Sequence, residues 1–162
     1  MIRKPESIDG DVVFGCEDPD QNDSRACLDS YFDVLLERFD EPFERSKTNA
    51  VDVDSMRPPH GWLMIGRIDG QAVACGALKR VDADVADIKH VWVSEAARGR
   101  GVGGGLMTAL EKLAESEGFR FVRLDTNRNL VEAVAMYRAR GYAEVDAFND
   151  EFYAHHWFIK TL

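Results

Sequence analysis

The sequence predicts an α/β fold of the α+β kind, with a mixed but mostly antiparallel sheet of six or seven strands flanked by about four helices. Two β-prone runs, residues 62–68 and 72–78, enclose Asp-Gly-Gln at residues 69–71. Asp-Gly between apolar runs is typical of a hairpin. A second pairing is expected where residues 81–86 turn into residues 87–93. A glycine-rich turn into a helix then follows, which also fits a sheet packed against helices.

After that helix, residues 119–124 read as a strand and residues 129–140 as a helix, which Gly141 ends as a C′ glycine does. Residues 142–145 and 153–159 are expected to be the closing strands. The order is therefore three antiparallel strands, helix, strand, helix and two strands.

The first sixty residues carry weaker signals. Residues 12–14 are a short strand candidate, and Asp23 or Ser24 is placed to cap a helix. The apolar positions of that helix recur at a spacing of 3.6 and are Cys27, Leu28, Tyr31, Phe32, Leu35, Leu36 and Phe39. Residues 41–60 are polar and end in two prolines, which favours a loop or a poorly ordered segment. Such a long connection often shapes a substrate entrance, and a surface excursion is an equal alternative.

Length and composition indicate one globular domain in a reducing compartment. A chain of 162 residues is long enough for a single core, and no apolar run approaches the roughly 20 residues that a membrane span needs. Residues 1–5 have no apolar stretch behind their charges, so no signal peptide is expected. The three cysteines are an odd number without metal-ligand spacing, which predicts free thiols in the cytoplasm and no metal.

The charge balance narrows the class of partner. Twenty basic residues against 29 acidic ones give a net charge of −9. Nucleic-acid binding rests on cationic patches, so it is disfavoured. A negative field fits a cationic or amine-bearing substrate, and a charge that only keeps the protein soluble fits equally well.

The most informative stretch is the glycine-rich turn at residues 98–105, where five glycines fall within seven positions between an apolar run and a helix. Its first residues include two arginines, Arg98 and Arg100. A strand that passes through glycines into a helix brings unpaired backbone N–H groups and a positive dipole end to one point. The turn is therefore a candidate phosphate site.

One version of that site is a dinucleotide fold, because Gly99-x-Gly101-x-x-Gly104 matches the dinucleotide fingerprint. That fingerprint belongs in the first turn of a parallel βαβ run. Here three antiparallel strands come first and too few βα units follow. A nucleotide P-loop is disfavoured further, because no Gly-Lys-Ser/Thr ends the turn.

A second pattern fits its context. Arg98-x-x-Gly101-x-Gly103, followed by a helix, resembles motif A of the GNAT acetyltransferases, and Ala133-x-x-x-Tyr137-x-x-x-Gly141 resembles a second segment of that family. The resemblance covers about residues 61–162, and residues 124–127, 147–150 and 155–158 look like a branch also found fused to MarR-type regulators. The implied fold is a GNAT sheet splayed in the middle for acetyl-CoA.

The resemblance implies a division into a cofactor-binding core at residues 61–162 and a variable substrate-side segment at residues 1–60 of one N-acetyltransferase domain. The implied reaction moves an acetyl group from acetyl-CoA to a small-molecule or peptide amine by direct attack in a ternary complex. The alternative is an acyl-CoA sensor without catalysis. Family members often dimerise, so a homodimer is a further implication.

For the cofactor, backbone N–H groups and glycines suit a pyrophosphate, and the two arginines add positive charge. The candidate pyrophosphate residues are Arg98, Gly99, Arg100, Gly101, Val102, Gly103 and Gly104. The resemblance gives Val91, Trp92 and Val93 the role of pairing with the peptide-like pantetheine arm. Many relatives have Asn where this chain has Leu130, so Asn127 or Asn129 is expected to substitute.

For the chemistry, the resemblance places the Tyr137 hydroxyl beside the coenzyme sulfur, as the acid. Asp87 and Asp125 stand where relatives carry a glutamate base, and both are one methylene shorter, so a bridging water is expected. The adjacent pair at residues 155–156 offers a histidine base, of which at most one faces the site. The resemblance also suggests Asn149, Glu151 and His155 as substrate contacts.

Overall fold

The computed structural model describes residues 11–162, so the expectation about a signal peptide at residues 1–5 lies outside the described residues. The strands are β1 (Val12–Cys16), β2 (Gly61–Ile68), β3 (Gln71–Arg80), β4 (Val85–Val93), β5 (Phe121–Thr126), β6 (Ala143–Val145) and β7 (His156–Thr161). The α-helices of this part of the chain are α1 (Asn22–Arg38), α2 (Val102–Ser116) and α3 (Val131–Ala139). Three short 3₁₀ helices, η1 (Arg45–Lys47), η2 (Asp54–Met56) and η3 (Glu95–Ala97), complete it.

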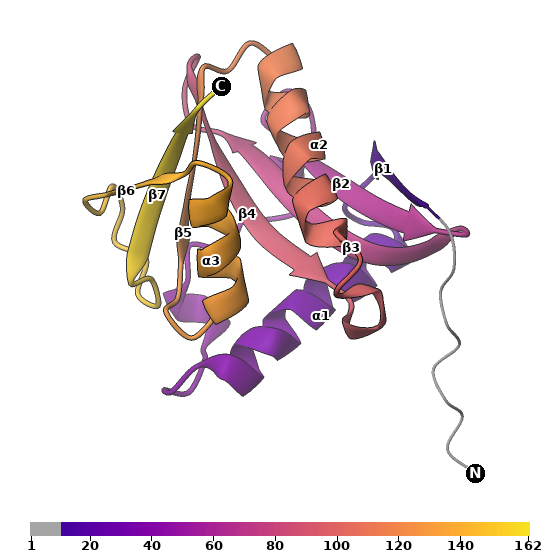
Figure 1. Ribbon diagram of the computed structural model, residues 1–162, viewed down its shortest axis with the longest axis horizontal. Helices are drawn as coiled ribbons and strands as arrows, with labels where there is room; N and C mark the ends of the chain where they lie inside the picture. The colour runs from indigo at the N-terminus through magenta and orange to yellow at the C-terminus, as the bar shows by residue number, and fades with distance from the viewer. Residues whose placement is uncertain (1–10) are drawn as a thin grey trace.

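The seven strands form one sheet in the order β1-β2-β3-β4-β5-β7-β6. The β4–β5 pair is parallel and the other neighbouring pairs are antiparallel, which confirms the mixed, mostly antiparallel sheet. Asp69 and Gly70 both have positive φ, as the tight turn of the β2–β3 hairpin requires. Figure 1 shows α2 and α3 in front of the sheet and α1 behind it, extending past the lower ends of the strands.

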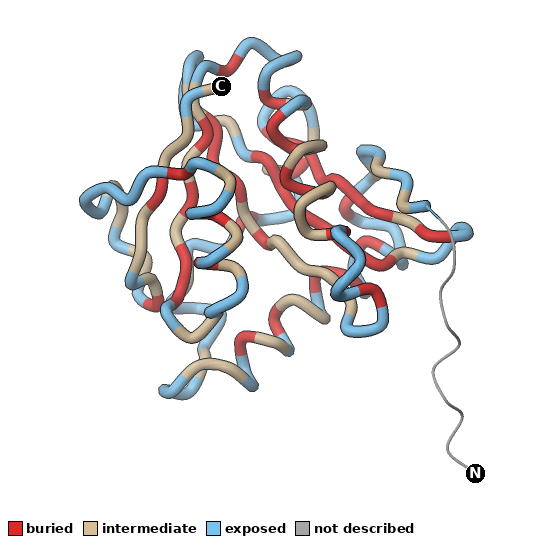
Figure 2. Tube along the Cα trace, in the orientation of Figure 1, coloured by how far each residue is buried: buried red, intermediate tan, exposed pale blue. Residues whose placement is uncertain are grey.

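Side chains that alternate along the central strands build a core on each face of the sheet. On the α2 and α3 face, Met64 and Leu78 pack with Leu106 and Leu110. On the other face, Ile65, Cys75 and Ala77 pack with Cys27 and Leu28 of α1. In Figure 2 the buried residues, in red, accordingly lie along the middle strands of the sheet.

The parallel pair β4–β5 is short, and this opens the sheet. Its register runs only from Val85 opposite Phe121 to Asp87 opposite Arg123. Beyond Asp87, β4 diverges from β5, and the two strands form a V in Figure 1. The side of β4 that faces β5 is therefore left without a strand partner from residue 88 onward, while its other side continues to pair with β3.

Two local predictions were wrong. Residues 81–84 are a turn and the strand begins only at Val85, because the Asp82 carboxylate accepts hydrogen bonds from the backbone N–H groups of Asp84 and Val85. The N-cap of α1 is Gln21 instead of Asp23 or Ser24. The Ser24 hydroxyl donates instead to the Asp18 carbonyl oxygen at 2.8 Å.

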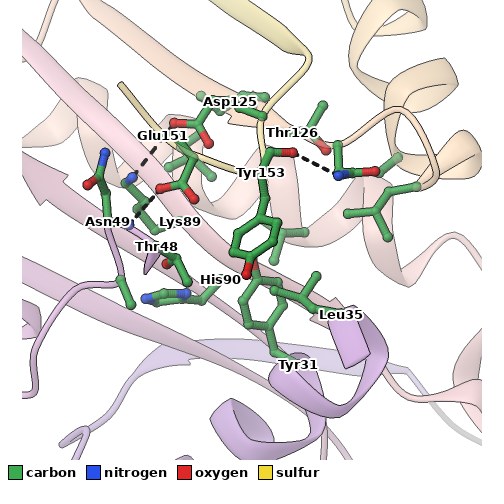
Figure 3. Close-up of a pocket in the computed structure, with 18 of the residues that line it drawn as sticks. Tyr31, Leu35, Thr48, Asn49, Lys89, His90, Asp125, Thr126, Glu151 and Tyr153 are labelled. Carbon is green, nitrogen blue, oxygen red and sulfur yellow. Dashed lines mark hydrogen bonds and ion pairs between the residues drawn. The ribbon is translucent and has the colours of Figure 1, made fainter. Parts of the chain in front are cut away.

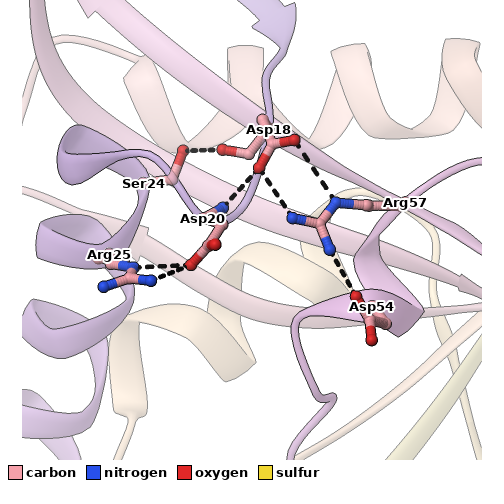
Figure 4. Close-up of polar contacts among 6 residues, drawn as sticks. All are labelled: Asp18, Asp20, Ser24, Arg25, Asp54 and Arg57. Atoms are coloured by element: carbon pink, nitrogen blue, oxygen red, sulfur yellow. Dashed lines mark hydrogen bonds and ion pairs between the residues drawn. The ribbon is translucent and has the colours of Figure 1, made fainter.

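Residues 41–60 form a loop with two 3₁₀ turns, and side chains attach it to the rest of the fold. The Arg57 guanidinium donates to both carboxylate oxygens of Asp18, at 3.1 and 3.4 Å, and to Asp54 at 2.5 Å (Figure 4). At the other end of the loop, the Tyr153 hydroxyl donates to the Pro42 carbonyl and accepts from the Glu44 N–H. The loop is thereby fixed both to the segment between β1 and α1 and to the segment before β7.

Candidate functional site

A cavity of about 360 Å³ lies where the diverging end of β4, the start of α2 and α3 face α1. We call it the cofactor cavity. Its lining includes Val91, Trp92, Val93, Arg98, Gly99, Gly101, Val102 and Gly103 of the residues predicted to bind the cofactor, together with Tyr31, Leu35, Leu130, Ala133 and Met136. The mouth carries Arg38, which pairs with Glu132 at 3.0 Å.

The start of α2 meets the physical requirements of an anion site. Gly101 is the N-cap at φ 75°, and no side chain caps the helix. The Gly101 carbonyl accepts from Gly105 N–H at 3.0 Å. The N–H groups of residues 102–104 precede that bond, so they lack an intrahelical acceptor. Three donors and the positive end of a 15-residue helix dipole therefore point toward one place.

The other predicted cofactor residues lie around this cavity without lining it. Gly104 is inside the first turn of α2, and a Cβ there would be 3.8 Å from the Arg140 guanidinium. Arg100 lies between the two positive-φ glycines, outside the lining. Asn127 donates to the Tyr153 carbonyl at 2.7 Å, and Asn129 to the Arg38 carbonyl at 2.9 Å. Both asparagine side chains are thus engaged in fixing neighbouring segments.

A second cavity, of about 90 Å³, lies between the ends of β4 and β5 and beneath residues 43–50. We call it the acceptor cavity. It shares Tyr31, Leu35, Val91, Leu130 and Ala133 with the cofactor cavity, so the two meet at these side chains. Figure 3 shows Asp125, Glu151, Lys89 and Asn49 gathered in one part of it, and Tyr31, Leu35 and Tyr153 in another.

Tyr137 lines the acceptor cavity from α3. Its ring packs at 5.8 Å from that of Tyr142 and 6.1 Å from that of Phe158, and the residue is 5% exposed. Within residues 11–162 the structure gives its hydroxyl no hydrogen bond. Burial, and then the charge of Asp125, raise the pKa of Tyr137, so the phenol stays protonated near neutral pH.

The two predicted carboxylate bases occupy different places. Asp87 lies in the short β4–β5 pairing, where it accepts from the Arg123 guanidinium at 2.6 Å, and it lines neither cavity. Asp125 lines the acceptor cavity. It accepts from the Asn149 amide at 2.9 Å and lies 3.8 Å from the Lys89 ammonium.

Of the three residues predicted to contact substrate, one lines the acceptor cavity and two do not. Glu151 lines the acceptor cavity and accepts from the Asn49 N–H at 2.6 Å. Burial is the largest cause that raises the pKa of Glu151, and the nearby Asp125 charge adds to it. Asn149 holds Asp125 from outside the cavity lining. His155 accepts from the Arg128 N–H through Nδ1 and lines neither cavity.

His156 likewise lies outside both cavities. It pairs with Glu144 at 3.2 Å.

Sequence reasoning did not single out His90 or Tyr31 as site residues, and both line the acceptor cavity. His90 is 6% exposed, sits at φ 56° where the β3–β4 register shifts, and its Nε2 accepts from the Val51 N–H at 3.2 Å. Burial lowers the pKa of His90 to about 3. Tyr31 belongs to the apolar stripe of α1, where a site residue cannot be told from a core residue by periodicity. No residue pattern around His90 signals its positive φ, since left-handed backbone is rare for residues other than glycine, Asn and Asp.

Within residues 11–162, no group of three or more His, Cys, Asp or Glu side chains could hold a metal ion. In the same range, no helix is long and apolar enough to cross a membrane.

Comparison with known proteins agrees with this geometry. The profile of the "Acetyltransferase (GNAT) family" matches residues 28–142, and the chain therefore belongs to the GNAT acetyltransferases. It is 24% identical over 119 residues to the "IAA acetyltransferase" of Azospirillum brasilense, a match that spans 70% of this chain and 78% of that one.

Solved structures share the fold. A GNAT-family acetyltransferase from Staphylococcus aureus superposes with a TM-score of 0.76 at 13% identity, over 93% of this chain and 99% of that one. A GNAT-family acetyltransferase from Elizabethkingia anophelis, solved with acetyl-CoA bound, superposes with a TM-score of 0.63 at 13% identity, over 93% of this chain and 97% of that one. The GNAT fold expected from the two motifs is confirmed.

Proposed function

We propose that the protein is an N-acetyltransferase that moves an acetyl group from acetyl-CoA to a primary amine by direct attack in a ternary complex. One observation carries the proposal: an anion-binding helix start and a carboxylate-containing cavity are joined through shared side chains, with Tyr137 beside the junction. A cofactor and an acceptor can then be held at the same time.

The cofactor cavity has the features that acetyl-CoA needs. The N–H groups of residues 102–104 and the Arg98 guanidinium suit a pyrophosphate, and the unpaired side of β4 at residues 91–93 suits a peptide-like arm. When bound, acetyl-CoA supplies a thioester carbonyl as the electrophile.

Two groups of the acceptor cavity manage the protons. Glu151 takes a proton from the amine, because burial raises its pKa, whereas the Asp125 carboxylate is engaged by Lys89 and Asn149. Tyr137, protonated and without a protein acceptor, donates a proton to the leaving sulfur. An acceptor that enters as its ammonium first loses one proton to solvent. The neutral amine then attacks: the C–N bond forms, the C–S bond breaks, nitrogen loses one proton to Glu151 and sulfur gains one from Tyr137, and the Glu151 proton returns to Tyr137 through solvent.

The environment of Asp87 gives it a different role, as the ion-pair partner of Arg123 where the sheet begins to open. Three free cysteines suit a reducing cytoplasm as the place of reaction. The homodimer and the MarR-linked branch stay predictions.

Calorimetry with acetyl-CoA and an acceptor screen that follows free thiol release test the proposal. We expect micromolar binding and amine-dependent thiol release. Binding without turnover for every amine would assign the chain to the acyl-CoA sensors instead. Failure to bind acetyl-CoA at high micromolar concentration would rule out both functions.

A further inference from the structure

Building on the proposed function, we infer that the natural acceptor is a small primary amine on an apolar body, with no carboxylate on the carbon that bears the amine. Three features of the acceptor cavity support this inference: the charges of its lining, its aromatic walls, and residues 43–50, which cover it.

The charged groups that line the acceptor cavity are two carboxylates, Asp125 and Glu151, and one ammonium, Lys89. Lys89 is already 3.8 Å from Asp125. His90, the other titratable base of the lining, is neutral because burial holds its pKa at about 3. The cavity therefore carries a net charge of −1, which an ammonium group neutralises.

A zwitterionic amino acid would leave that charge in place. Its α-carboxylate would lie within a few ångströms of Glu151 or Asp125, and the one cation of the lining is already paired with Asp125. Like charges at such distances in a half-buried site repel strongly enough to change binding by tenfold or more. The negative charge thus discriminates against amino acids.

The walls are aromatic. Rings of Phe39, Phe43 and Tyr153 pack on one another with centroids 5.1 to 5.7 Å apart, and Tyr31 lies on the α1 side. Such walls match an alkyl or aryl body, since they offer area and ring faces but few donors. An ammonium beside ring faces is further favoured by cation–π attraction.

The cover favours a small molecule over a polypeptide. Residues 43–50 cross the cavity and are held by the Tyr153 hydroxyl at Glu44 and by Glu151 at Asn49. A cavity of about 90 Å³ under this segment suits a group of several heavy atoms. An extended peptide would require both hydrogen bonds to open.

The test compares probes that differ only in the α-carboxylate: 2-phenylethylamine against phenylalanine, and butylamine against norvaline. We expect kcat/KM for each amine to exceed that of its amino acid by at least about tenfold. An α-carboxylate lowers the basicity of the amine and so raises its neutral fraction. Reactivity alone would therefore favour the amino acids. A higher kcat/KM for the amines would then show that the cavity itself discriminates against the α-carboxylate.

Glu151→Gln tests the role of the negative charge. Loss of the base slows acetylation of the amine and of its amino acid alike, so the ratio of their kcat/KM values still reports how the cavity discriminates between them. We expect the ratio to fall toward one, since the cavity becomes neutral. Glu144→Gln is the matched control: Glu144 is a carboxylate on β6 that pairs with Arg138 and lines neither cavity. Its ratio should equal that of the wild type.

The outcomes separate this inference from the proposed function. If acetyl-CoA binds and the amino acids, or a peptide such as Phe-Ala, are acetylated as fast as the amines, the inference is wrong and the acetyltransferase stands. If acetyl-CoA binds and neither amine is acetylated, the inference is also wrong. If acetyl-CoA does not bind, the proposed function itself fails.

Discussion

The backbone N–H of Asn49 donates a 2.6 Å hydrogen bond to the Glu151 carboxylate and thereby joins two segments that are 102 residues apart. This bond lowers the pKa of Glu151, but the opposing effect of burial is larger, so the pKa is raised overall. The segment that covers the acceptor cavity, residues 43–50, thus contacts the Glu151 carboxylate, which we propose takes the proton from the amine.

A first prediction concerns the pH dependence of turnover. Glu151 must be ionised to accept a proton, so kcat/KM should fall as pH drops through its raised pKa. Glu151→Gln should be slower by about 10²-fold near neutral pH and should lose this acid-side fall. Rate profiles from pH 4.5 to 8 with 2-phenylethylamine measure both. An unchanged acid limb in the variant would assign the titration to another group.

A second prediction concerns the acid. Tyr137→Phe should lower kcat by about 10²-fold and leave the Kd for acetyl-CoA unchanged, because only the hydroxyl is lost. Tyr142→Phe is the control, since Tyr142 is an equally buried neighbour whose hydroxyl donates to Glu111 outside both cavities. Single-turnover rates and calorimetry distinguish the two. Equal kcat in Tyr137→Phe and wild type would remove Tyr137 from the mechanism.

A third prediction concerns the start of α2. Gly101 and Gly118 both have positive φ, and at both the space for a Cβ is open. Alanine at either position should cost about 1 kcal/mol of stability from backbone strain. Only Gly101→Ala should also weaken acetyl-CoA binding, by about tenfold, because it disturbs the N–H groups of the helix start. Urea unfolding and calorimetry give the two quantities, and equal affinity losses would contradict the anion site.

A fourth prediction concerns stability against pH. His90 has a folded pKa of about 3 against an ordinary value of 6.5, so between these values the unfolded chain binds a proton that the folded chain does not. Folding stability should therefore be full above pH 6.5 and fall, by at most about 1.4 kcal/mol per pH unit, as pH drops toward 3.

His90→Gln tests that sign, since a glutamine oxygen can still accept from Val51 N–H and cannot titrate. Urea denaturation at pH 7, 6, 5 and 4.5 should show a slope in the wild type that is smaller by about one proton in the variant. Parallel curves would mean that His90 binds its proton equally well in the folded and unfolded chains, which would contradict the lowered pKa.

Much of the fold followed from local patterns. Asp69-Gly70 between apolar runs, the glycines at residues 99–105 and Gly141 each demand a backbone conformation, and the structure has positive φ at Asp69, Gly70, Gly99, Gly101 and Gly141. The wrong details were also local: Asp82 closes a turn with its own carboxylate, and Ser24 turns back to Asp18. Side-chain hydrogen bonds of this kind compete with strand and cap geometry in ways that residue type alone does not decide.

The acceptor site was harder to predict, because its parts are far apart in the chain. Asp87 and Asp125 are both strand aspartates in sequence, yet only Asp125 reaches the acceptor cavity, since the sheet opens after Asp87. Glu151 was expected to contact substrate, and the proton role proposed for it rests on its burial, which raises its pKa.

The sequence by itself determined the order of elements, the glycine turn that begins α2 and the family, because each rests on residues close together in the chain. Only the tertiary structure decided that the two cavities meet, that Tyr31 of α1 lies at their junction and that Glu151 has a raised pKa. Those properties depend on distances and burial between segments up to a hundred residues apart, which no local pattern encodes.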